Sequence, residues 1–495
     1  MTWAAVLAPV LVVGTFAGLF ALGMATGVGG GLLGLTPAVS CSVTVHTENG
    51  ADDAIQTAIN TYPGGTICIG AGTFPEQLTI TNSNTILKGA GASKTIIEPN
   101  TPLVLNTVDY DSNGAATPAA AIILVEGNSG TPTSGVTGVT IEDLQVNGLS
   151  GQNSFSSCSD NYFGVDFQAS SGTLTSAAVN DIALPTLDYG CQDGLAVYAY
   201  NGWFNYAGSN YEPDTVTISH TTLSGYDKNG ITCDDPDETC VVSSDTVTGI
   251  GPTPLIADNG IQIAFGALGT VSANTVDANG VYTGNNGCSG SDQSAYDVCS
   301  DNEGAGILLY DAATGSTVSS NSLSLNEYGI DSFADGNTSL GYSGPVSTTI
   351  SHNTVDSSVA YGIVAEGAPG SADSATITSN TINNKESLNS MVWGAPGILV
   401  DTGSFTVSDN TIEGTSVASG ASNGASQTVC GPTDFSSCTS GPTTQSLPTA
   451  AIQAASENIS NVTYLYLGSN SYSDNAYKFA TLGVDGGSVD AVEVE

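Results

Sequence analysis

A short pattern that recurs along most of the chain constrains its fold more than any other feature. Segment 318–323 reads VSSNSL, and further segments repeat its order of β-branched pair, asparagine and apolar residue. Close copies begin at Val271, Ile350, Ile377 and Val407, and weaker ones at Ile218 and Val242. A glycine followed by alternating apolar residues recurs at Gly164, Gly194, Gly230, Gly260, Gly306, Gly329, Gly362 and Gly397. Repeats a few tens of residues apart are typical of solenoids.

The repeat predicts three short strands and three corners in each turn. Its β-branched pairs favour strands, and the asparagine between them tolerates the left-handed backbone conformation of a tight corner. The repeated glycine marks another corner. Successive turns would stack at about 4.8 Å. The sequence therefore predicts an all-β fold, a parallel β-helix without helical periodicity in its rungs.

Two groups of residues resemble the pectin-lyase-like superfamily of right-handed parallel β-helices. The repeated asparagine is similar to the asparagine ladder of that family, and its members here are Asn274, Asn321, Asn353, Asn380 and Asn410. Segment 53–60 and the strand-like residues up to Gly91 resemble the entry of pectin methylesterases, where a short amphipathic helix covers the open end. The resemblance spans roughly residues 41–415. It implies the fold but no single function, because the superfamily includes lyases, hydrolases, esterases, epimerases, tailspikes and adhesins.

These features divide the chain into five parts. We expect an apolar segment at 1–40, an N-terminal cap at 41–62 and a parallel β-helix with loop insertions at 63–415. A Ser/Thr/Gly/Pro-rich insertion follows at 416–450, and a last rung with a C-terminal cap at 451–495.

The first 40 residues contain no charged side chain, and the stretch from Trp3 to Ala25 is long and apolar enough to cross a bilayer. The small residues around Ala25 fit an export signal, although the usual basic flank is missing. A membrane anchor is a second interpretation. The third is a filament-core helix, for which the segment weakly resembles a type IV pilin. The partners expected from this segment are a membrane or copies of the same chain.

Charge and cysteine content place the protein outside the cell or on its surface. Acidic residues number 47 against five lysines, and there is no arginine, which excludes nucleic acid as a partner. The ten cysteines form five sequential pairs, 41–68, 158–191, 233–240, 288–299 and 430–438, as expected for disulfides in an oxidising compartment: Cys41, Cys68, Cys158, Cys191, Cys233, Cys240, Cys288, Cys299, Cys430 and Cys438. Three sequons, at Asn337, Asn458 and Asn461, predict glycosylation.

The glycine-led strands carry acidic and aromatic residues on the face that should point to solvent. Candidate glycan contacts there are Asp166, Tyr198, Asp234 and Tyr310, and a catalytic interpretation uses Asp331, Glu366 and Asp401. Glu366 and Asp401 would occupy equivalent positions on successive rungs, a spacing that suits retaining glycoside hydrolysis. The plainer interpretation is a solvated strand face.

The motifs of the known enzyme families are missing. Pectate lyases and pectin methylesterases depend on arginine. The pair Asp234 and Asp235 is similar to the paired aspartates of polygalacturonases, but the Gly-His-Gly motif that accompanies them is absent. Residues 235–238 lack the histidine of the Asp-Pro-His-Glu motif of mannuronan epimerases.

Residues Asp109, Asp111 and Asn113 match the first half of a calcium loop, which makes calcium a candidate ligand, while the glutamate that would complete the loop is missing. A polar turn is the alternative, and no other cofactor is expected. We therefore expect an extracellular structural or adhesive protein, such as a filament or surface-layer subunit, rather than an enzyme. The alternative is a secreted polysaccharide-active enzyme, a glycoside hydrolase or lyase.

Overall fold

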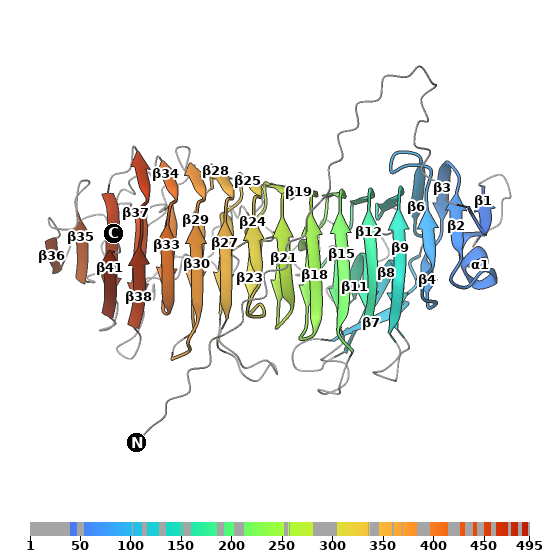
Figure 1. Ribbon diagram of the computed structural model, residues 1–495. Helices are drawn as coiled ribbons and strands as arrows, with labels where there is room; N and C mark the ends of the chain where they lie inside the picture. The colour runs from blue at the N-terminus through green and yellow to red at the C-terminus, as the bar shows by residue number, and fades with distance from the viewer. Residues whose placement is uncertain are drawn as a thin grey trace, which may run out of the picture. The chain divides into compact units, whose positions relative to one another are not determined.

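The computed structural model describes residues 40–46, 54–100, 102–110, 116–127, 135–149, 151, 160–185, 193–201, 212–251, 256, 258–280, 304–334, 336, 346–358, 361–368, 370–383, 397–413, 426–430, 439–442, 450–456, 462–473, 477–483 and 488–493. Within these residues the unit 41–495 is built from three long sheets, which we call sheets A, B and C (Figure 1).

Sheet A contains fourteen parallel strands. In spatial order they are β1 (Val43–Val45), β2 (Thr66–Ile69), β5 (Ile86–Lys88), β9 (Val136–Glu142), β12 (Ser170–Thr175), β15 (Asp214–Ser219), β18 (Glu238–Ser243), β21 (Leu268–Ser272), β24 (Thr317–Ser319), β27 (Ser347–Ser351), β30 (Ser374–Thr378), β33 (Ser404–Ser408), β38 (Val462–Leu467) and β41 (Ser488–Glu493).

Sheet B contains twelve parallel strands. They are β3 (Gly72–Pro75), β6 (Thr95–Glu98), β10 (Gln145–Asn147), β13 (Ala178–Asn180), β16 (Thr222–Ser224), β19 (Thr246–Thr248), β22 (Thr275–Asp277), β25 (Ser322–Ser324), β28 (Thr354–Asp356), β31 (Thr381–Asn383), β34 (Thr411–Glu413) and β39 (Ser471–Ser473).

Sheet C contains fifteen strands. The parallel ones are β4 (Leu78–Ile80), β8 (Ala116–Glu126), β11 (Asn161–Gln168), β14 (Leu195–Tyr200), β17 (Asn229–Asp234), β20 (Asn259–Ala264), β23 (Ala305–Tyr310), β26 (Tyr328–Phe333), β29 (Tyr361–Glu366), β32 (Ile398–Asp401), β37 (Ala450–Ser456) and β40 (Tyr477–Gly483). Antiparallel additions are β7 (Thr107–Tyr110) on β8, β35 (Ser426–Cys430) on β40 and β36 (Thr439–Pro442) on β35.

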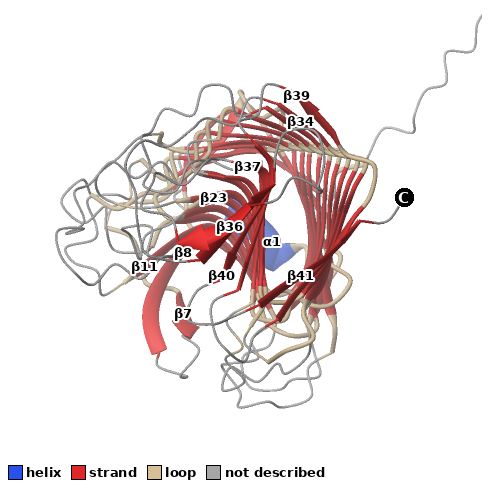
Figure 2. Ribbon diagram, turned by 90° about the vertical axis from the view of Figure 1, so that its left-hand side faces the viewer, coloured by secondary structure: helices blue, strands red, loops and turns tan. Residues whose placement is uncertain are grey.

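The chain passes from sheet A to sheet B to sheet C once in every turn, so each strand pairs with its counterpart one turn later (Figure 2). Alternate side chains of each strand point inward, where Ile, Val and Leu side chains stack into one continuous core. The predicted parallel β-helix is confirmed. Its one helix in the described residues is α1 (Ala54–Thr61), as the sequence predicted.

Helix α1 covers the N-terminal end of the core. Ile55, Ala58 and Ile59 are buried against the first rungs. The carboxylate of the buried Glu76 accepts hydrogen bonds from the backbone N–H groups of Ile55, at 2.9 and 3.0 Å, and Gln56, at 3.0 Å. An anion at this position satisfies donors that a helix N-terminus leaves open and complements the helix dipole.

The asparagine ladder at the corner between sheets A and B is confirmed. Asn321 Oδ1 accepts hydrogen bonds from the backbone N–H and the Nδ2 of Asn274, while its own Nδ2 donates to Asn353 Oδ1 and to the Val271 carbonyl. The same pattern continues through Asn380, Asn410 and Asn470, the last of which the sequence analysis did not include. Each ladder asparagine therefore satisfies the hydrogen-bonding groups of the next one.

Two conformational expectations were wrong. The left-handed residue at the ladder corner is the one before the asparagine, such as Ser320 (φ 59°) or His352 (φ 57°), because the asparagine itself must point its amide inward. Six of the eight repeated glycines lie within sheet C strands, Gly194 and Gly397 immediately precede β14 and β32, and among the eight only Gly194 has a positive φ. They are needed for space, since a Cβ on Gly230 would lie 2.6 Å from the Gly260 carbonyl oxygen.

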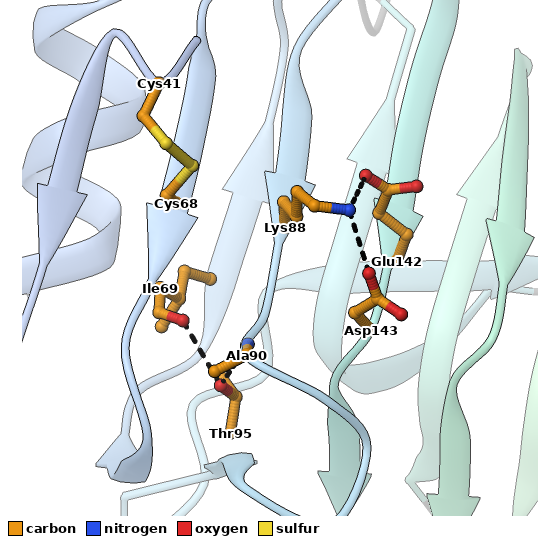
Figure 3. A network of polar contacts seen from close by, with 8 residues as sticks. All are labelled: Cys41, Cys68, Ile69, Lys88, Ala90, Thr95, Glu142 and Asp143. Carbon is orange, nitrogen blue, oxygen red and sulfur yellow. Dashed lines mark hydrogen bonds and ion pairs between the residues drawn. A yellow bond between two sulfur atoms is a disulfide. The ribbon is translucent and has the colours of Figure 1, made fainter. Parts of the chain in front are cut away.

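Two of the predicted disulfides lie in the described residues, and both are confirmed: Cys41–Cys68, which Figure 3 shows, and Cys233–Cys240. The other three pairs, the sequons and residues 1–39 lie outside the residues whose side chains the structure describes. Among the described residues, no helix is long and apolar enough to cross a membrane.

Candidate active site

Two outward-facing rows of side chains run along sheet C. The first row carries Asp166, Tyr198, Thr232, Gln262, Leu308 and Asp331, one from each successive strand. The second carries Gln168, Tyr200, Asp234, Ala264, Tyr310, Phe333, Glu366 and Asp401. Because parallel strands lie about 4.8 Å apart, residues of one row are separated by that spacing for each rung.

The first half of this face gathers acids around two tyrosines, and we call Asp109, Asp166, Tyr198, Asp234 and Asp235 the acid cluster. Tyr198 and Tyr200 stack with ring centroids 4.5 Å apart, and Phe163 packs against Tyr198 at 5.1 Å. Four cluster members are buried; Asp109, from β7, is half-buried. The cluster unites Asp166, Tyr198 and Asp234, three of the predicted glycan contacts.

Strand β7 brings Asp109 over the outward face of β14. The Asn161 Nδ2 donates to Asp109 Oδ2 at 2.7 Å, and the Tyr198 hydroxyl donates weakly to Oδ1 at 3.4 Å. The Tyr200 hydroxyl donates to the Val108 carbonyl at 3.3 Å. Figure 2 shows β7 outside the ring of sheets, beside β8 and β11. The hydrogen bonds stabilise Asp109 as a carboxylate.

Asp166 is the opposite case, because neither of its carboxylate oxygens has a hydrogen-bond partner and the residue is fully buried. Burial, with the charges of Asp109 and Glu126, holds the pKa of Asp166 well above its usual range. Asp166 is therefore a neutral acid beside a hydrogen-bonded carboxylate.

Asp234 shows the same tendency one strand beyond Tyr200. Burial, followed by the charges of Asp235 and Asp109, raises its pKa well above the usual range, while a hydrogen bond from Gln262 opposes the shift. Its Oδ1 has no partner. Burial and the nearby Asp109, Asp234 and Asp235 also raise the pKa of the Tyr198 hydroxyl, which keeps it a donor.

An aromatic patch lies farther along the second row. Tyr310 and Phe333 stack with ring centroids 5.5 Å apart, and Phe265 meets Tyr310 edge-on at 5.3 Å. All three rings are half-buried. Tyr310, the fourth predicted glycan contact, belongs to this patch and lies two rungs from Asp234.

The three residues of the catalytic interpretation lie beyond the aromatic patch. Glu366 and Asp401 are register partners on β29 and β32, whereas Asp331 pairs with Val364 and belongs to the other row. Asp401 is buried, and its Oδ1 accepts a hydrogen bond from the Thr402 hydroxyl at 2.8 Å. Neither Glu366 nor Asp331 joins the acid cluster.

The structure brings together one set of three metal-ligand side chains among the described residues, Cys233, Glu238 and Cys240. The two cysteines form a disulfide, so this set has no thiolate to bind a metal. Of the predicted calcium loop only Asp109 is described, and Asp111 and Asn113 lie outside the described residues. Calcium there stays a prediction.

Sequence reasoning did not bring three residues of this region into the site: Asp109 was predicted only as a calcium ligand, Asp235 only as part of a motif, and Tyr200 was not predicted. Asp235 follows β17 at a left-handed position (φ 84°), and Asp109 arrives through an antiparallel hairpin that interrupts the repeat. Tyr200 follows from the row position, two residues after Tyr198. The signal in the sequence was the pair Asp234 and Asp235, which was compared only with the longer motif of polygalacturonases.

No protein-family model and no curated protein sequence matches the chain. Among solved structures, it is similar to the catalytic domain of a GH87 alpha-1,3-glucanase in complex with tetrasaccharides, with 14% identity, 91% of this chain and 69% of that chain covered, and a TM-score of 0.47. The periplasmic alginate epimerase AlgG shows 10% identity, coverage of 91% and 84%, and a TM-score of 0.43. DFA-IIIase from Arthrobacter chlorophenolicus A6 shows 10% identity, coverage of 84% and 76%, and a TM-score of 0.40.

These comparisons correct one expectation. We expected a structural or adhesive protein, but the similar structures are enzymes: an alpha-1,3-glucanase, a mannuronan C-5 epimerase, an alginate epimerase and a DFA-IIIase. The absence of arginine had excluded known motifs without excluding other arrangements of acids. At these identities the likeness concerns the fold alone. The chain has the right-handed parallel β-helix fold that its three parallel sheets form.

Proposed function

We propose that the acid cluster is the active site of a secreted glycoside hydrolase that acts on neutral polysaccharides. The observation that carries the proposal is the pairing of a neutral acid with a carboxylate: Asp166 is buried without a partner, and Asp109 nearby is held by Asn161 and Tyr198. Glycoside hydrolysis needs this division of roles between two carboxyl groups.

In the proposed reaction, Asp166 gives its proton to the leaving glycosidic oxygen. Asp109 stabilises the positive charge that develops on the sugar and assists the attack of water, so one water molecule is added across the broken bond. Asn161 positions Asp109 through its Nδ2. Asp234, with its unpartnered Oδ1, is available to accept a sugar hydroxyl.

The aromatic patch supports a polysaccharide rather than a small sugar. Phe265, Tyr310 and Phe333 offer apolar ring area on the same face of sheet C as the acids. Charge supports a neutral substrate, because a chain with a net charge of −42 repels acidic glycans and has no arginine to bind their carboxylates.

The acids are covered in this structure, so the proposal requires the cover over β14 to loosen enough to admit a sugar while the 2.7 Å hydrogen bond from Asn161 keeps Asp109 in place. The contacts that must loosen are the two long hydrogen bonds from the tyrosine hydroxyls, from Tyr200 to the Val108 carbonyl at 3.3 Å and from Tyr198 to Asp109 at 3.4 Å. Such opening is common in enzymes that exclude water from their chemistry.

The test is the conservative variant Asp166→Asn, assayed for release of reducing ends from a panel of neutral α- and β-glucans. We expect turnover by the unaltered protein and a loss of at least about 100-fold in the variant, because the amide cannot supply the proton. Asp409→Asn, an exposed corner residue, is the control and should keep full activity. Glycan binding without turnover by the unaltered protein would contradict the proposal.

A further inference from the structure

Two carboxyl groups face each other inside the coil, at the corner where sheet C leads back to sheet A. Asp214 is the first residue of β15 and Glu238 the first of β18, and the two are register partners. Each begins an alternation of buried residues, continued by Val216 and Ile218 on β15 and by Cys240 and Val242 on β18. Both side chains therefore point inward, toward the core.

Among the described residues, no group that acts on Glu238 could neutralise a negative charge. Its exposed fraction is 1%, and neither carboxylate oxygen accepts a well-aligned hydrogen bond. The backbone N–H of Thr239 is near enough to favour the charged form slightly. The titratable groups that act on Glu238 are Asp214 from β15 and Asp235 from the β17–β18 turn, and both are acidic.

The remaining neighbours are neutral. The Cys233–Cys240 disulfide lies beside the Glu238 carboxylate. The rung before Asp214 places Ser170 in line, whose hydroxyl donates to the Val125 carbonyl, and Ser171 donates to Asp214 at 2.9 Å. The rung after Glu238 places the apolar Ala267 just before β21. Among the described lysines, Lys88 binds Glu142 and Asp143, Lys228 acts on Asp227 and Asp258, and the exposed Lys94 is not among the groups that act on Glu238.

Two stacked carboxyls in such a site cannot both be ionised, because burial and mutual repulsion oppose charge. Burial first, then Asp214 and Asp235, raises the pKa of Glu238 well above its usual range. Burial raises the pKa of Asp214 to about 6, although the bond from Ser171 opposes the shift.

We propose that Glu238 and Asp214 form a proton-operated lock, which holds the corner between sheets C and A closed in acid and loosens it toward neutral pH. The folded state keeps protons that the unfolded chain has already released at ordinary carboxyl values. The stabilisation is complete below the pKa of the carboxyl group in the unfolded chain. It is lost as pH rises toward the raised pKa in the folded protein, which for Asp214 means between pH 4 and about 6. The protein is thus built for an acidic medium.

Thermal unfolding of the full chain between pH 3 and pH 8 tests whether stability falls as pH rises. We expect the unfolding midpoint to fall by several degrees as pH rises above about 4. Glu238→Gln should be more stable than the unaltered protein at pH 8 and should show a flatter profile, whereas Asp409→Asn should follow the unaltered profile. A midpoint that is constant or rises with pH, or a Glu238→Gln profile parallel to the unaltered one, would overturn the lock.

A second measurement needs no variant. The Cys233–Cys240 disulfide is fully buried beside the lock, while Cys41 of the Cys41–Cys68 disulfide is exposed. We expect reduction of Cys233–Cys240 by a phosphine, relative to Cys41–Cys68 in the same sample, to accelerate at least about tenfold between pH 4.5 and pH 8 if the corner opens. An unchanged ratio would overturn the proposal. Glycan turnover enters neither measurement, so the lock and the proposed enzyme function fail or succeed separately.

Discussion

Two of the three corners of the solenoid solve the same problem with different chemistry. At the corner between sheets A and B, asparagines stack inside the coil, and each amide accepts from one neighbour and donates to the other. At the corner between sheets C and A, Asp214 and Glu238 also stack in register, but an ionised carboxylate can only accept. A solenoid repeats its contacts, so a self-complementary side chain stabilises every rung, and an acid in the same position needs a proton.

The ladder itself changes from amide to carboxyl side chains at one rung. Asp245 occupies the rung before Asn274: its Oδ1 accepts from the Thr221 N–H at 2.7 Å, and its own N–H donates to Asn274 Oδ1. Its Oδ2 has no partner. Burial raises the pKa of Asp245 to about 7, against the bonds from the backbone N–H groups of Thr221 and Ser243.

The largest effect should come from making the amide corner acidic. Asn353→Asp keeps the acceptor for Asn321 but loses the donors to Asn380 Oδ1 and the Val318 carbonyl. At pH 8 the buried charge and the lost bonds should lower the free energy of unfolding by about 3 kcal/mol or more. Urea unfolding at pH 8 and pH 4 measures this, with a smaller loss expected at pH 4. An equal loss at both values would show that charge is not the cause.

The reverse change should have a smaller effect of opposite sign. Asp245→Asn supplies the missing donor next to Asn274 and removes a buried acid whose pKa is about 7. The acid form stabilises the fold below its ordinary value and loses that contribution as pH rises through 7, so the variant should gain about 1 kcal/mol at pH 8 and nothing at pH 4. The same urea titration tests it, and a gain that is independent of pH would count against the comparison.

The smallest effect should come from the ion pair on the outside of sheet A. The Lys88 Nζ lies 2.7 Å from Glu142 Oε1 and 2.8 Å from Asp143 Oδ2, and all three side chains are partly exposed (Figure 3). Lys88→Met should cost less than about 1 kcal/mol, because solvent and salt screen such pairs. The difference should shrink further in 1 M salt. A loss as large as that of Asn353→Asp would mean that surface charge matters as much as the inner corners.

The sequence was sufficient for the fold because the ladder asparagine recurs in successive rungs from Asn274 onward and the inward aliphatic residues recur along the whole coil. It also indicated one face of sheet C, since alternation alone places Asp166, Tyr198 and Asp234 outward. It could not reveal Asp109, which reaches that face through a hairpin inserted outside the repeat. It missed Asp214 and Glu238 for another reason: a polar residue at the start of a strand reads as solvent-facing until the register is known.

The in-register ladder also gives the molecule a unit of length. Removing segment 305–327 would delete one strand from each sheet, with Asn321, and would bring Asn274 directly beside Asn353. The shortened coil would keep every remaining inward contact and lose about 4.8 Å. Insertion or deletion of whole rungs can therefore change the distance between the acid cluster and the C-terminal rungs in multiples of this spacing. The acid cluster and the C-terminal rungs themselves would stay unchanged.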